Sequence, residues 1–243
     1  MISAQRAQSP ALRTGLVVYD LDGTLVDSAG HIRHTVNRVR AELGLRDLTL
    51  EDVRPCIGDG ARSLVARTLF GRELLSGAPG YDVATGRSFP EVFALFMERY
   101  LEDPSSGVTV MDGVFETLEA LHRAGVAQAV LTNKPHDVTQ PVIDGLGLRR
   151  FTPLALGPGA MLPGLDGELP PKPDPTGLRW LLQRYGVAPA EALMVGDGSQ
   201  DARVAANAGV PAWLIGQSGV RSFPSFTELG EALRGRIAQE SGG

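Results

Sequence analysis

Three carboxylates stand close together near the start of the chain, in the segment LVVYDLDGTLVDS at residues 16–28. Asp20 and Asp22 are two positions apart and follow an apolar stretch, residues 16–19, that we expect to be buried. A turn after a strand explains Asp22-Gly23, because Asp-Gly is ordinary turn chemistry. Burying two neighbouring carboxylates costs free energy unless another group compensates their charge. Carboxylates can act as nucleophiles, exchange protons and bind Mg²⁺. We therefore expect other residues of the chain to compensate the charge of Asp20 and Asp22.

From about residue 108 onward, short apolar runs alternate with amphipathic stretches, which is typical of βαβ units around a parallel sheet. The runs are apolar at consecutive positions, so we expect strands that are covered on both faces. The expected strands are LVVYD (16–20), VAQAVLT (126–132), LALG (154–157), ALMVGD (192–197) and PAWLIG (211–216). Helical spacing of apolar residues predicts helices between them, near residues 114–121 and 178–185.

Polar residues follow the expected strands, at the edge where the carboxyl ends of a parallel sheet gather ligands. Thr132 and Asn133 follow the second strand, and Asp197 ends the fourth, with Asp201 four residues later. Lys172 lies in a proline-rich segment after the third strand. Taken singly, Asp197 could be only a helix N-cap and Lys172 only a solvated loop charge. Together they would bring a hydroxyl, an amide, an ammonium group and carboxylates to one place.

The residues between the first strand and the rest of the α/β pattern read as helical. Three apolar stripes have helical spacing, and no convincing strand run separates them. The stripes consist of Ile32, Val36, Val39 and Leu43; of Ala61, Leu64, Val65, Thr68 and Leu69; and of Val92, Phe93, Phe96 and Tyr100. We therefore expect an α/β fold, a Rossmann-like open parallel sheet core domain with an inserted all-helical cap domain. The expected division is a disordered tail at 1–14, the core at 15–27 and 105–236, and the cap at 28–104.

Composition excludes several classes of protein. A formal net charge of −5 over 243 residues, with scattered basic residues, argues against nucleic-acid binding. The single cysteine, Cys56, excludes an intramolecular disulfide and a multi-cysteine metal cluster. Gly196-Asp197-Gly198 begins like a dinucleotide fingerprint, but position 201 is Asp where that motif needs Gly. The chain shows neither a signal-peptide core nor an apolar segment of membrane-spanning length, so we expect a cytoplasmic protein without membrane contact.

Taken together, these segments resemble the haloacid dehalogenase superfamily over nearly the whole chain. DLDGT at 20–24 resembles its first motif, Thr132-Asn133 its second, Lys172-Pro173 its third, and Gly196-Asp197 with Asp201 its fourth. The insert resembles the mobile helical lid of one subgroup. Within that subgroup, the segments most similar to phosphoglycolate phosphatases are IGDGARSLVARTL (57–69), TNKP (132–135) and KPDP (172–175). Related sugar-phosphate and pyrophosphate enzymes share much of this pattern.

The resemblance implies a Mg²⁺-dependent phosphatase with an aspartyl-phosphate intermediate. Asp20 would be the nucleophile, and Asp22 would give a proton to the leaving oxygen and later take one from water. The Asp20 carboxylate, the Asp22 backbone carbonyl and Asp197 would hold Mg²⁺. Asp201 would be a further ligand or would fix the metal's waters.

The remaining motif residues would handle the phosphoryl group. By the same resemblance, Lys172 would balance charge on Asp20 and on that group. Thr132 and backbone amides around Asn133 would hold its oxygens, and Gly23 would let the backbone turn closely beneath it.

A turn in the cap is the candidate for reading the rest of the substrate. Gly58-Asp59-Gly60 opens a helix, and free amides at such an end suit an anionic group. Gly58, Gly60 and Arg62, on the first turn, are therefore expected substrate-binding residues. A solvated surface arginine is an equally good interpretation of Arg62.

The leading hypothesis is a phosphatase for a small phosphomonoester, with 2-phosphoglycolate as the first candidate. Alternatives are a phosphatase for a sugar phosphate, a nucleotide or pyrophosphate, and a phosphomutase, which shares the first half of the chemistry. A haloacid dehalogenase would have no use for Asp22 and Asp197. A non-catalytic module that binds a phosphoryl ligand would tolerate loss of Asp20 or Asp22, and both are present. The expected partner is a small phosphorylated metabolite, bound by a monomer or homodimer.

Overall fold

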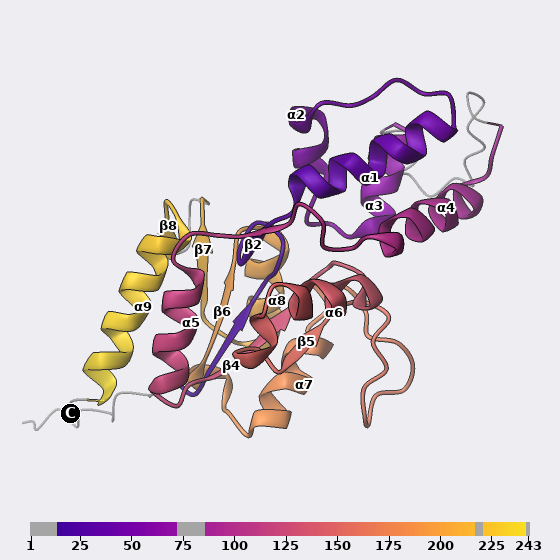
Figure 1. Ribbon diagram of the computed structural model, residues 1–243. Coiled ribbons are helices and arrows are strands. Elements are labelled where there is room, and N and C mark those ends of the chain that lie inside the picture. The colour runs from indigo at the N-terminus through magenta and orange to yellow at the C-terminus, as the bar shows by residue number, and fades with distance from the viewer. Residues whose placement is uncertain (1–13, 72–85, 217–220, 242–243) are drawn as a thin grey trace, which may run out of the picture.

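The computed structural model describes residues 14–71, 86–216 and 221–241, which form an α/β core and a separate group of helices (Figure 1). Residues 1–13 of the expected tail lie outside the described part. Thr14, which we had assigned to that tail, is buried, and its backbone N–H donates to Glu240 Oε2 at 2.8 Å. Thr14 therefore belongs to the core, because it is tied to the last helix.

The core is built on an open parallel sheet, which confirms the predicted fold class. Within the described residues, six strands pair in the order β5 (Leu154–Leu156), β4 (Ala127–Leu131), β1 (Leu16–Tyr19), β6 (Ala192–Gly196), β7 (Ala212–Ile215) and β8 (Arg221–Phe223). β1 is central, and Leu16 is paired with both Ala127 and Ala192. The four residues of β1 are fully buried, since helices cover both faces.

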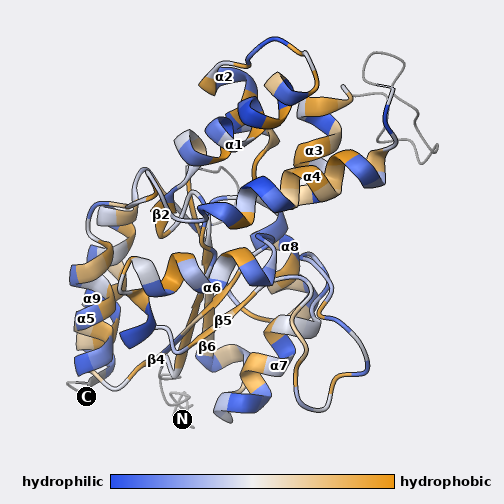
Figure 2. Cartoon of the chain, turned by 45° about the vertical axis from the view of Figure 1, so that its right-hand side comes forward, coloured by the Kyte–Doolittle hydropathy of each residue, from blue (hydrophilic) through white to orange (hydrophobic). Residues whose placement is uncertain are grey.

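Helices cover the sheet on two sides, and their apolar residues form one core layer on each. One layer includes residues of α5 (Val114–Arg123), α6 (His136–Gly145) and α9 (Phe226–Ser241). The other includes residues of α7 (Thr176–Tyr185) and α8 (Ser199–Ala208). Figure 2 shows the strands as mainly hydrophobic and the helices as mixed in hydropathy, as expected for helices that pack by one face. Short 3-10 turns occur at Leu148–Arg150 (η3) and Pro189–Glu191 (η4).

Three short strands escaped the sequence analysis. β2 (Val26–Asp27) and β3 (Thr109–Val110) form a small antiparallel pair, and β8 adds an edge to the main sheet. Two or three residues are too few to show an alternating pattern, and β2 and β3 are also far apart in sequence. The pair β2–β3 lies where the chain leaves and re-enters the core, so it ties together the two connections to the helical insert.

The insert is helical in its described residues, which confirms the predicted helical cap. It contains α1 (Ala29–Glu42), α2 (Leu50–Val53), the 3-10 turn η1 (Arg54–Cys56), α3 (Ala61–Leu69) and α4 (Phe89–Glu102). Apolar residues from all four α-helices form a separate core, which Val138 of α6 joins. The cap thus packs against the main domain beside the carboxyl end of β4, and Figure 1 shows it beyond one end of the sheet.

Local sequence signals fix several cap elements. Thr49 and Asp52 form a capping box at the start of α2, and Ser88 and Glu91 form one at the start of α4. Among the helices that the model describes, none combines the length and the apolar character that crossing a bilayer requires.

Candidate active site

Asp20 stands at the carboxyl end of the central strand and is held from two sides. Its backbone N–H donates to Val195 O at 2.8 Å, which continues the pairing of β1 with β6. Its Oδ1 accepts from the backbone N–H of Leu21 at 2.7 Å and lies 2.9 Å from Lys172 Nζ. The hydrogen bonds of the described residues leave Oδ2 without a donor. The carboxylate is therefore oriented by one oxygen, while the other is available to a ligand.

Lys172 is fixed through its main chain as well as its side chain. Asn133 Oδ1 accepts from the Lys172 backbone N–H at 2.7 Å, and Asn133 Nδ2 donates to the Lys172 carbonyl at 3.2 Å. Its buried Nζ lies between Asp20 Oδ1 and Asp201 Oδ1, the latter at 2.6 Å. Burial alone would lower the pKa of Lys172, but Asp20 and Asp201 raise it above its usual value. Lys172 therefore remains a cation inside the protein.

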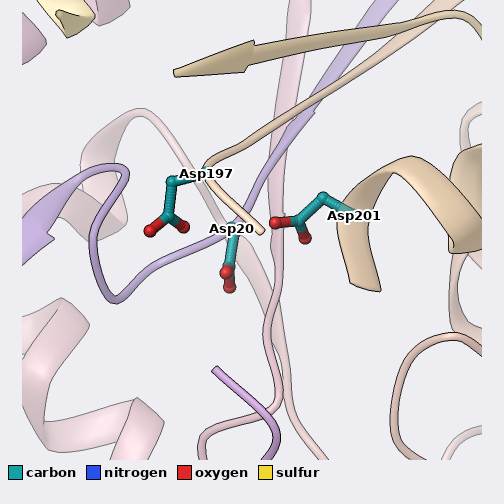
Figure 3. Close-up of side chains that lie close together, drawn as sticks. All are labelled: Asp20, Asp197 and Asp201. Carbon is teal, nitrogen blue, oxygen red and sulfur yellow. The ribbon is translucent and has the colours of Figure 1, made fainter. Parts of the chain in front are cut away.

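Three carboxylates form the candidate metal centre. Asp20, Asp197 and Asp201 each place an oxygen within 4.8 Å of the others, and they come from the ends of β1 and β6 and the first turn of α8 (Figure 3). Burial raises the pKa of Asp20 to about 7; the charge of Lys172 opposes this rise, and the charges of Asp201 and Asp197 add to it. Burial and the charge of Asp201 likewise raise the pKa of Asp197 to about 6. An all-oxygen set with uncompensated negative charge fits a hard cation such as Mg²⁺.

Small residues make room for this cluster. Gly23 has a φ of +83°, and a Cβ there would lie 2.2 Å from Asp197 Oδ2. Next to it, Thr24 Oγ1 donates to Asp197 Oδ1 at 3.2 Å. The loop after β1 therefore approaches Asp197 closely.

Asp22 has its own partners, separate from those of Asp20. Ser28 Oγ donates to Asp22 Oδ1 at 2.6 Å, and Lys134 Nζ lies 3.1 Å from the same oxygen. Lys134 is buried and also donates to the hydroxyl of Tyr100, a residue of α4 in the cap. Burial would lower the pKa of Lys134, but Asp22 and Tyr100 raise it. The second carboxylate is therefore held by a cation that in turn contacts the cap.

The residues after β4 lie against both carboxylates. Thr132 is buried, and its Oγ1 accepts from the backbone N–H of Lys134 at 3.2 Å. Thr132 and Asn133 line a small cavity of about 30 Å³ together with Asp20 and Asp22. The expected phosphoryl-binding residues thus share one cavity with the two acids.

A larger cavity of about 340 Å³ shares Asp20, Asp22, Ile57 and Gly58 with the small one. The core contributes the acidic cluster to its lining, together with Gly198, Ser199 and Gln200. The cap contributes Arg54, Ile57, Gly58 and Asp59. A ligand in this cavity would touch both parts of the molecule.

The glycine turn of the cap contacts the core directly. Asn133 Nδ2 donates to the Gly58 carbonyl at 3.0 Å, and Gln200 Nε2 donates to Asp59 Oδ1 at 2.9 Å. Gly60 is the N-cap of α3 and has a φ of +88°, and a Cβ there would lie 3.4 Å from the Asn133 carbonyl oxygen. Gly58 and Gly60 therefore lie beside the candidate site, and their turn closes over its edge.

Arg62, for which substrate binding and a solvated surface position were equally good interpretations, is exposed and lies over two aromatic rings of the cap. Its guanidinium lies 5.0 Å from the ring centre of Phe89 and 5.2 Å from that of Phe93, and Arg62 is absent from the lining of both cavities. A planar guanidinium gains energy from stacking on aromatic faces. Arg54, eight positions earlier, lines the larger cavity instead.

Sequence reasoning missed several residues of this site. They are Ser28, Arg54, Tyr100, Lys134 and Gln200. Lys134 stood in a quoted motif at a strand end, so a buried partner for Asp22 could have been sought there. The other four carry no local signal, because an exposed arginine or a tyrosine in an apolar stripe has the same pattern with or without a ligand.

Comparisons with known proteins place the chain in one family of hydrolases. Residues 17–215 match the model of the family described as haloacid dehalogenase-like hydrolase. A phosphoglycolate phosphatase of Pseudomonas putida (strain KT2440) is 38% identical over 201 residues, which are 83% of this chain and 69% of that protein. A phosphoglycolate phosphatase of Thiobacillus denitrificans is 35% identical over 213 residues, 88% of this chain and 87% of that protein. The match to phosphoglycolate phosphatase 1 of Pseudomonas aeruginosa covers 66% of that protein.

Solved structures show the same architecture. The crystal structure of a predicted phosphoglycolate phosphatase from Haemophilus somnus 129PT has a TM-score of 0.74 and 26% identity, and covers 90% of this chain and 97% of that one. CbbY from Rhodobacter sphaeroides, solved in complex with phosphate, has a TM-score of 0.69 and 22% identity, with 89% and 96% covered. At 22% identity, the similarity to CbbY is evidence for a shared fold alone.

Proposed function

Because the chain belongs to the haloacid dehalogenase-like hydrolases and is a phosphoric monoester hydrolase similar to phosphoglycolate phosphatases, we propose that it dephosphorylates a small phosphomonoester, with 2-phosphoglycolate as the first candidate. The observation that carries this proposal is the pair of differently held carboxylates at the end of β1. Asp20 is oriented by Lys172 and keeps one oxygen free of donors, while Asp22 is held by Lys134 and Ser28. Two acids with separate partners can perform two different tasks.

Asp20 is the proposed nucleophile. Its Oδ2 attacks phosphorus, the bond from phosphorus to the leaving oxygen breaks, and an aspartyl-phosphate forms on Asp20. Asp22 gives a proton to the leaving oxygen and thereby becomes a carboxylate. Water then attacks the phosphorus of this intermediate while Asp22 takes a proton from it. Inorganic phosphate leaves, and both carboxyls return to their first state.

The proposed metal is Mg²⁺, held by the Asp20 carboxylate, the backbone carbonyl of Asp22 and Asp197. When bound, it neutralises charge on the phosphoryl oxygens and on Asp20. Both oxygens of Asp201 already accept, from Lys172 Nζ and from the Gly198 backbone N–H at 3.0 Å. We therefore assign Asp201 chiefly to fixing Lys172 and the local backbone beside the metal.

The phosphoryl group has a further set of proposed contacts. Lys172 supplies a buried positive charge next to Asp20, and Thr132 supplies a hydroxyl at the end of the neighbouring strand. Backbone amides around Asn133 and the turn at Gly23 complete the cradle. Their alignment at one edge of the sheet supports the proposal.

Residues 28–104 are proposed to act as a lid domain. Two hydrogen bonds, from Asn133 to the Gly58 carbonyl and from Gln200 to the Asp59 carboxylate, join the lid to the core beside the cavity. A cavity of about 340 Å³ suits a phosphate with a small organic group. Closing it would exclude water other than the one that reacts.

A screen of purified enzyme with Mg²⁺ tests this function. The panel contains 2-phosphoglycolate, a sugar phosphate, a nucleoside monophosphate and pyrophosphate, and the readout is release of phosphate. We expect 2-phosphoglycolate to give the highest kcat/KM and Asp20→Asn to give no turnover on any substrate. A best substrate other than 2-phosphoglycolate would change the substrate assignment. Failure on the whole panel would overturn the proposed activity.

A further inference from the structure

The larger cavity has an unbalanced set of charges on its walls. Among the described residues that line it, Arg54 is the only basic one. The acidic residues of the lining are Asp20, Asp22, Asp27, Asp59, Asp197 and Asp201. Four of these acids pair with cations that do not line the cavity: Asp20 and Asp201 with Lys172, Asp22 with Lys134, and Asp59 with Arg67. Apart from the phosphoryl group, which is proposed to meet Lys172, a negatively charged group inside this cavity therefore has one lining cation to face, and that cation is Arg54.

Arg54 keeps most of its hydrogen-bonding capacity for a ligand. Its one ion pair within the described residues joins Nη2 to Asp27 Oδ2 at 3.5 Å, and the Arg54 side chain is 57% exposed. A guanidinium has five N–H donors in a planar fork that matches a carboxylate. Asp27 also accepts from the Ala29 backbone N–H at 3.0 Å, so it is shared between Arg54 and the first turn of α1. The guanidinium is thus weakly held, with donors to spare.

The backbone that carries Arg54 is well defined. Arg54 follows α2 directly and begins η1, with Pro55 as the next residue. The capping box of Thr49 fixes the start of α2, and a proline has a restricted φ. Three residues after Arg54 comes Ile57, which leads into the glycine turn at the cavity wall. The arginine is therefore placed at the cavity by a rigid corner of the cap.

Arg62 gives a direct contrast within the same cap. It too is exposed, but its guanidinium stacks on Phe89 and Phe93 and lines neither cavity. The two arginines are eight positions apart. Arg54 lines the larger cavity, and Arg62 does not. The cap cation that can meet a substrate is the one in the 3-10 turn.

We propose that Arg54 is a specificity-determining residue that binds an anionic group, such as a carboxylate, on the leaving-group part of the substrate. This inference rests on the proposed function and adds to it the contact that distinguishes a charged leaving group from a neutral one. Substrates whose leaving group ends in a carboxylate gain a charge-assisted pair with Arg54. Substrates of the same length that end in a hydroxyl do not.

The test compares two phosphate esters on four proteins. The esters are 2-phosphoglycolate and 2-hydroxyethyl phosphate, in which a hydroxymethyl group replaces the carboxylate. The proteins are wild type, Arg54→Gln, Arg54→Lys and Arg33→Gln, all assayed with Mg²⁺ by release of phosphate. Arg33 is an exposed cap arginine on α1 that lines neither cavity, so it controls for loss of one positive charge.

We expect Arg54→Gln to lower kcat/KM for 2-phosphoglycolate by about tenfold to hundredfold, the range for a lost charge-assisted pair. Its kcat/KM for 2-hydroxyethyl phosphate should stay within about threefold of wild type, which also shows that the variant is folded. Arg54→Lys should lie between, because it keeps the charge but loses the fork. Arg33→Gln should behave as wild type on both esters.

Two results would overturn the assignment of Arg54: equal losses on both esters, or no loss on either. If wild type itself hydrolyses neither ester, the assignment of 2-phosphoglycolate as substrate fails, and this inference fails with it. If wild type hydrolyses 2-hydroxyethyl phosphate at least as well as 2-phosphoglycolate, the phosphatase chemistry stands and the role of Arg54 is refuted.

Discussion

Lys134 Nζ lies 3.1 Å from Asp22 Oδ1 and also contacts the hydroxyl of Tyr100. This arrangement joins the second carboxylate of the site to helix α4 of the cap through one buried cation. Lys172 has the matching position beside Asp20, at 2.9 Å. Each of the two acids at the end of β1 therefore has its own lysine, and only one of these lysines also contacts the cap in the described structure.

The pair of Lys134 with Asp22 predicts an effect that depends on the leaving group. Lys134→Met should lower kcat/KM for an alkyl phosphate by about tenfold or more, because Asp22 loses the partner that orients it. Acetyl phosphate has a leaving group that needs little protonation, so its kcat/KM should fall by much less. The ratio kcat/KM is measured because it does not depend on the rate at which the aspartyl-phosphate intermediate is hydrolysed.

Tyr100→Phe is the matched control for that experiment. It keeps the pair of Lys134 with Asp22 and removes only the contact with the cap hydroxyl, so its loss should be smaller. Removing one partner of a buried ion pair costs roughly 3–5 kcal/mol, and Lys134→Met should therefore also lower Tm. Equal losses on the alkyl phosphate and on acetyl phosphate would show that Lys134 supports the fold and does not act through Asp22.

Asp20→Asn should abolish turnover while the protein stays folded, since the amide has nearly the size of the carboxylate but is a poor nucleophile. A rapid-quench experiment with ³²P-labelled substrate should detect phosphoprotein in wild type and none in the variant. Release of phosphate by Asp20→Asn at a rate near that of wild type would mean that water attacks phosphorus directly.

Removal of divalent metal should silence the enzyme, because the carboxylates of Asp20 and Asp197 then repel the phosphate that they are meant to receive. Adding Mg²⁺ should restore activity. Ca²⁺ should bind and raise Tm but support little turnover, because its longer and looser coordination misplaces the reacting groups. Full activity in excess chelator would refute the acidic cluster as a metal site.

The raised pKa values predict how the metal-free protein responds to pH. Burial and nearby carboxylates raise the pKa of Asp20 to about 7 and that of Asp197 to about 6, from 3.8 in both cases. The folded protein therefore holds protons that the unfolded chain releases. Its free energy of unfolding should fall as pH rises from about 4 to about 7, which is the sign required for raised acid pKa values.

Asp197→Asn should remove part of this fall in the free energy of unfolding. In excess chelator at pH 8, the variant should be more stable than wild type by roughly 1–3 kcal/mol, since about two pKa units correspond to nearly 3 kcal/mol. At pH 4 the two proteins should differ much less. Urea unfolding at both pH values measures this, with Asp166→Asn, an exposed acid, as the control. A variant that is less stable than wild type at pH 8 would contradict the prediction.

The size of the cavity predicts a preference among substrates. With about 340 Å³ between cap and core, 2-phosphoglycolate should have a higher kcat/KM than a nucleoside monophosphate, whose base and sugar would hold the lid open. Steady-state assays on the two substrates measure this ratio. A strong preference for nucleotides would overturn the substrate assignment and leave the phosphatase chemistry in place.

The sequence alone determined the features that arise from local patterns. Consecutive apolar residues predicted five of the strands, and helical spacing predicted the buried stripes of the cap, for example Val36, Phe96 and Tyr100. The same patterns predicted that Asp20, Thr132, Lys172 and Asp197 would lie near one edge of the sheet. The strands could be predicted because their patterns are local, and the shared edge follows because the carboxyl ends of parallel strands lie on the same side of the sheet.

Tertiary structure decided which side chains meet. Nothing near Asp22 in the sequence points to Lys134, which is 112 positions away, and nothing near Arg54 or Arg62 tells which arginine faces the cavity. The pair β2–β3 is likewise set by a partner more than eighty positions away, because two residues carry no pattern of their own. Contacts of this kind depend on how the cap packs against the core. Packing is a property of the whole chain, and no local window of sequence contains it.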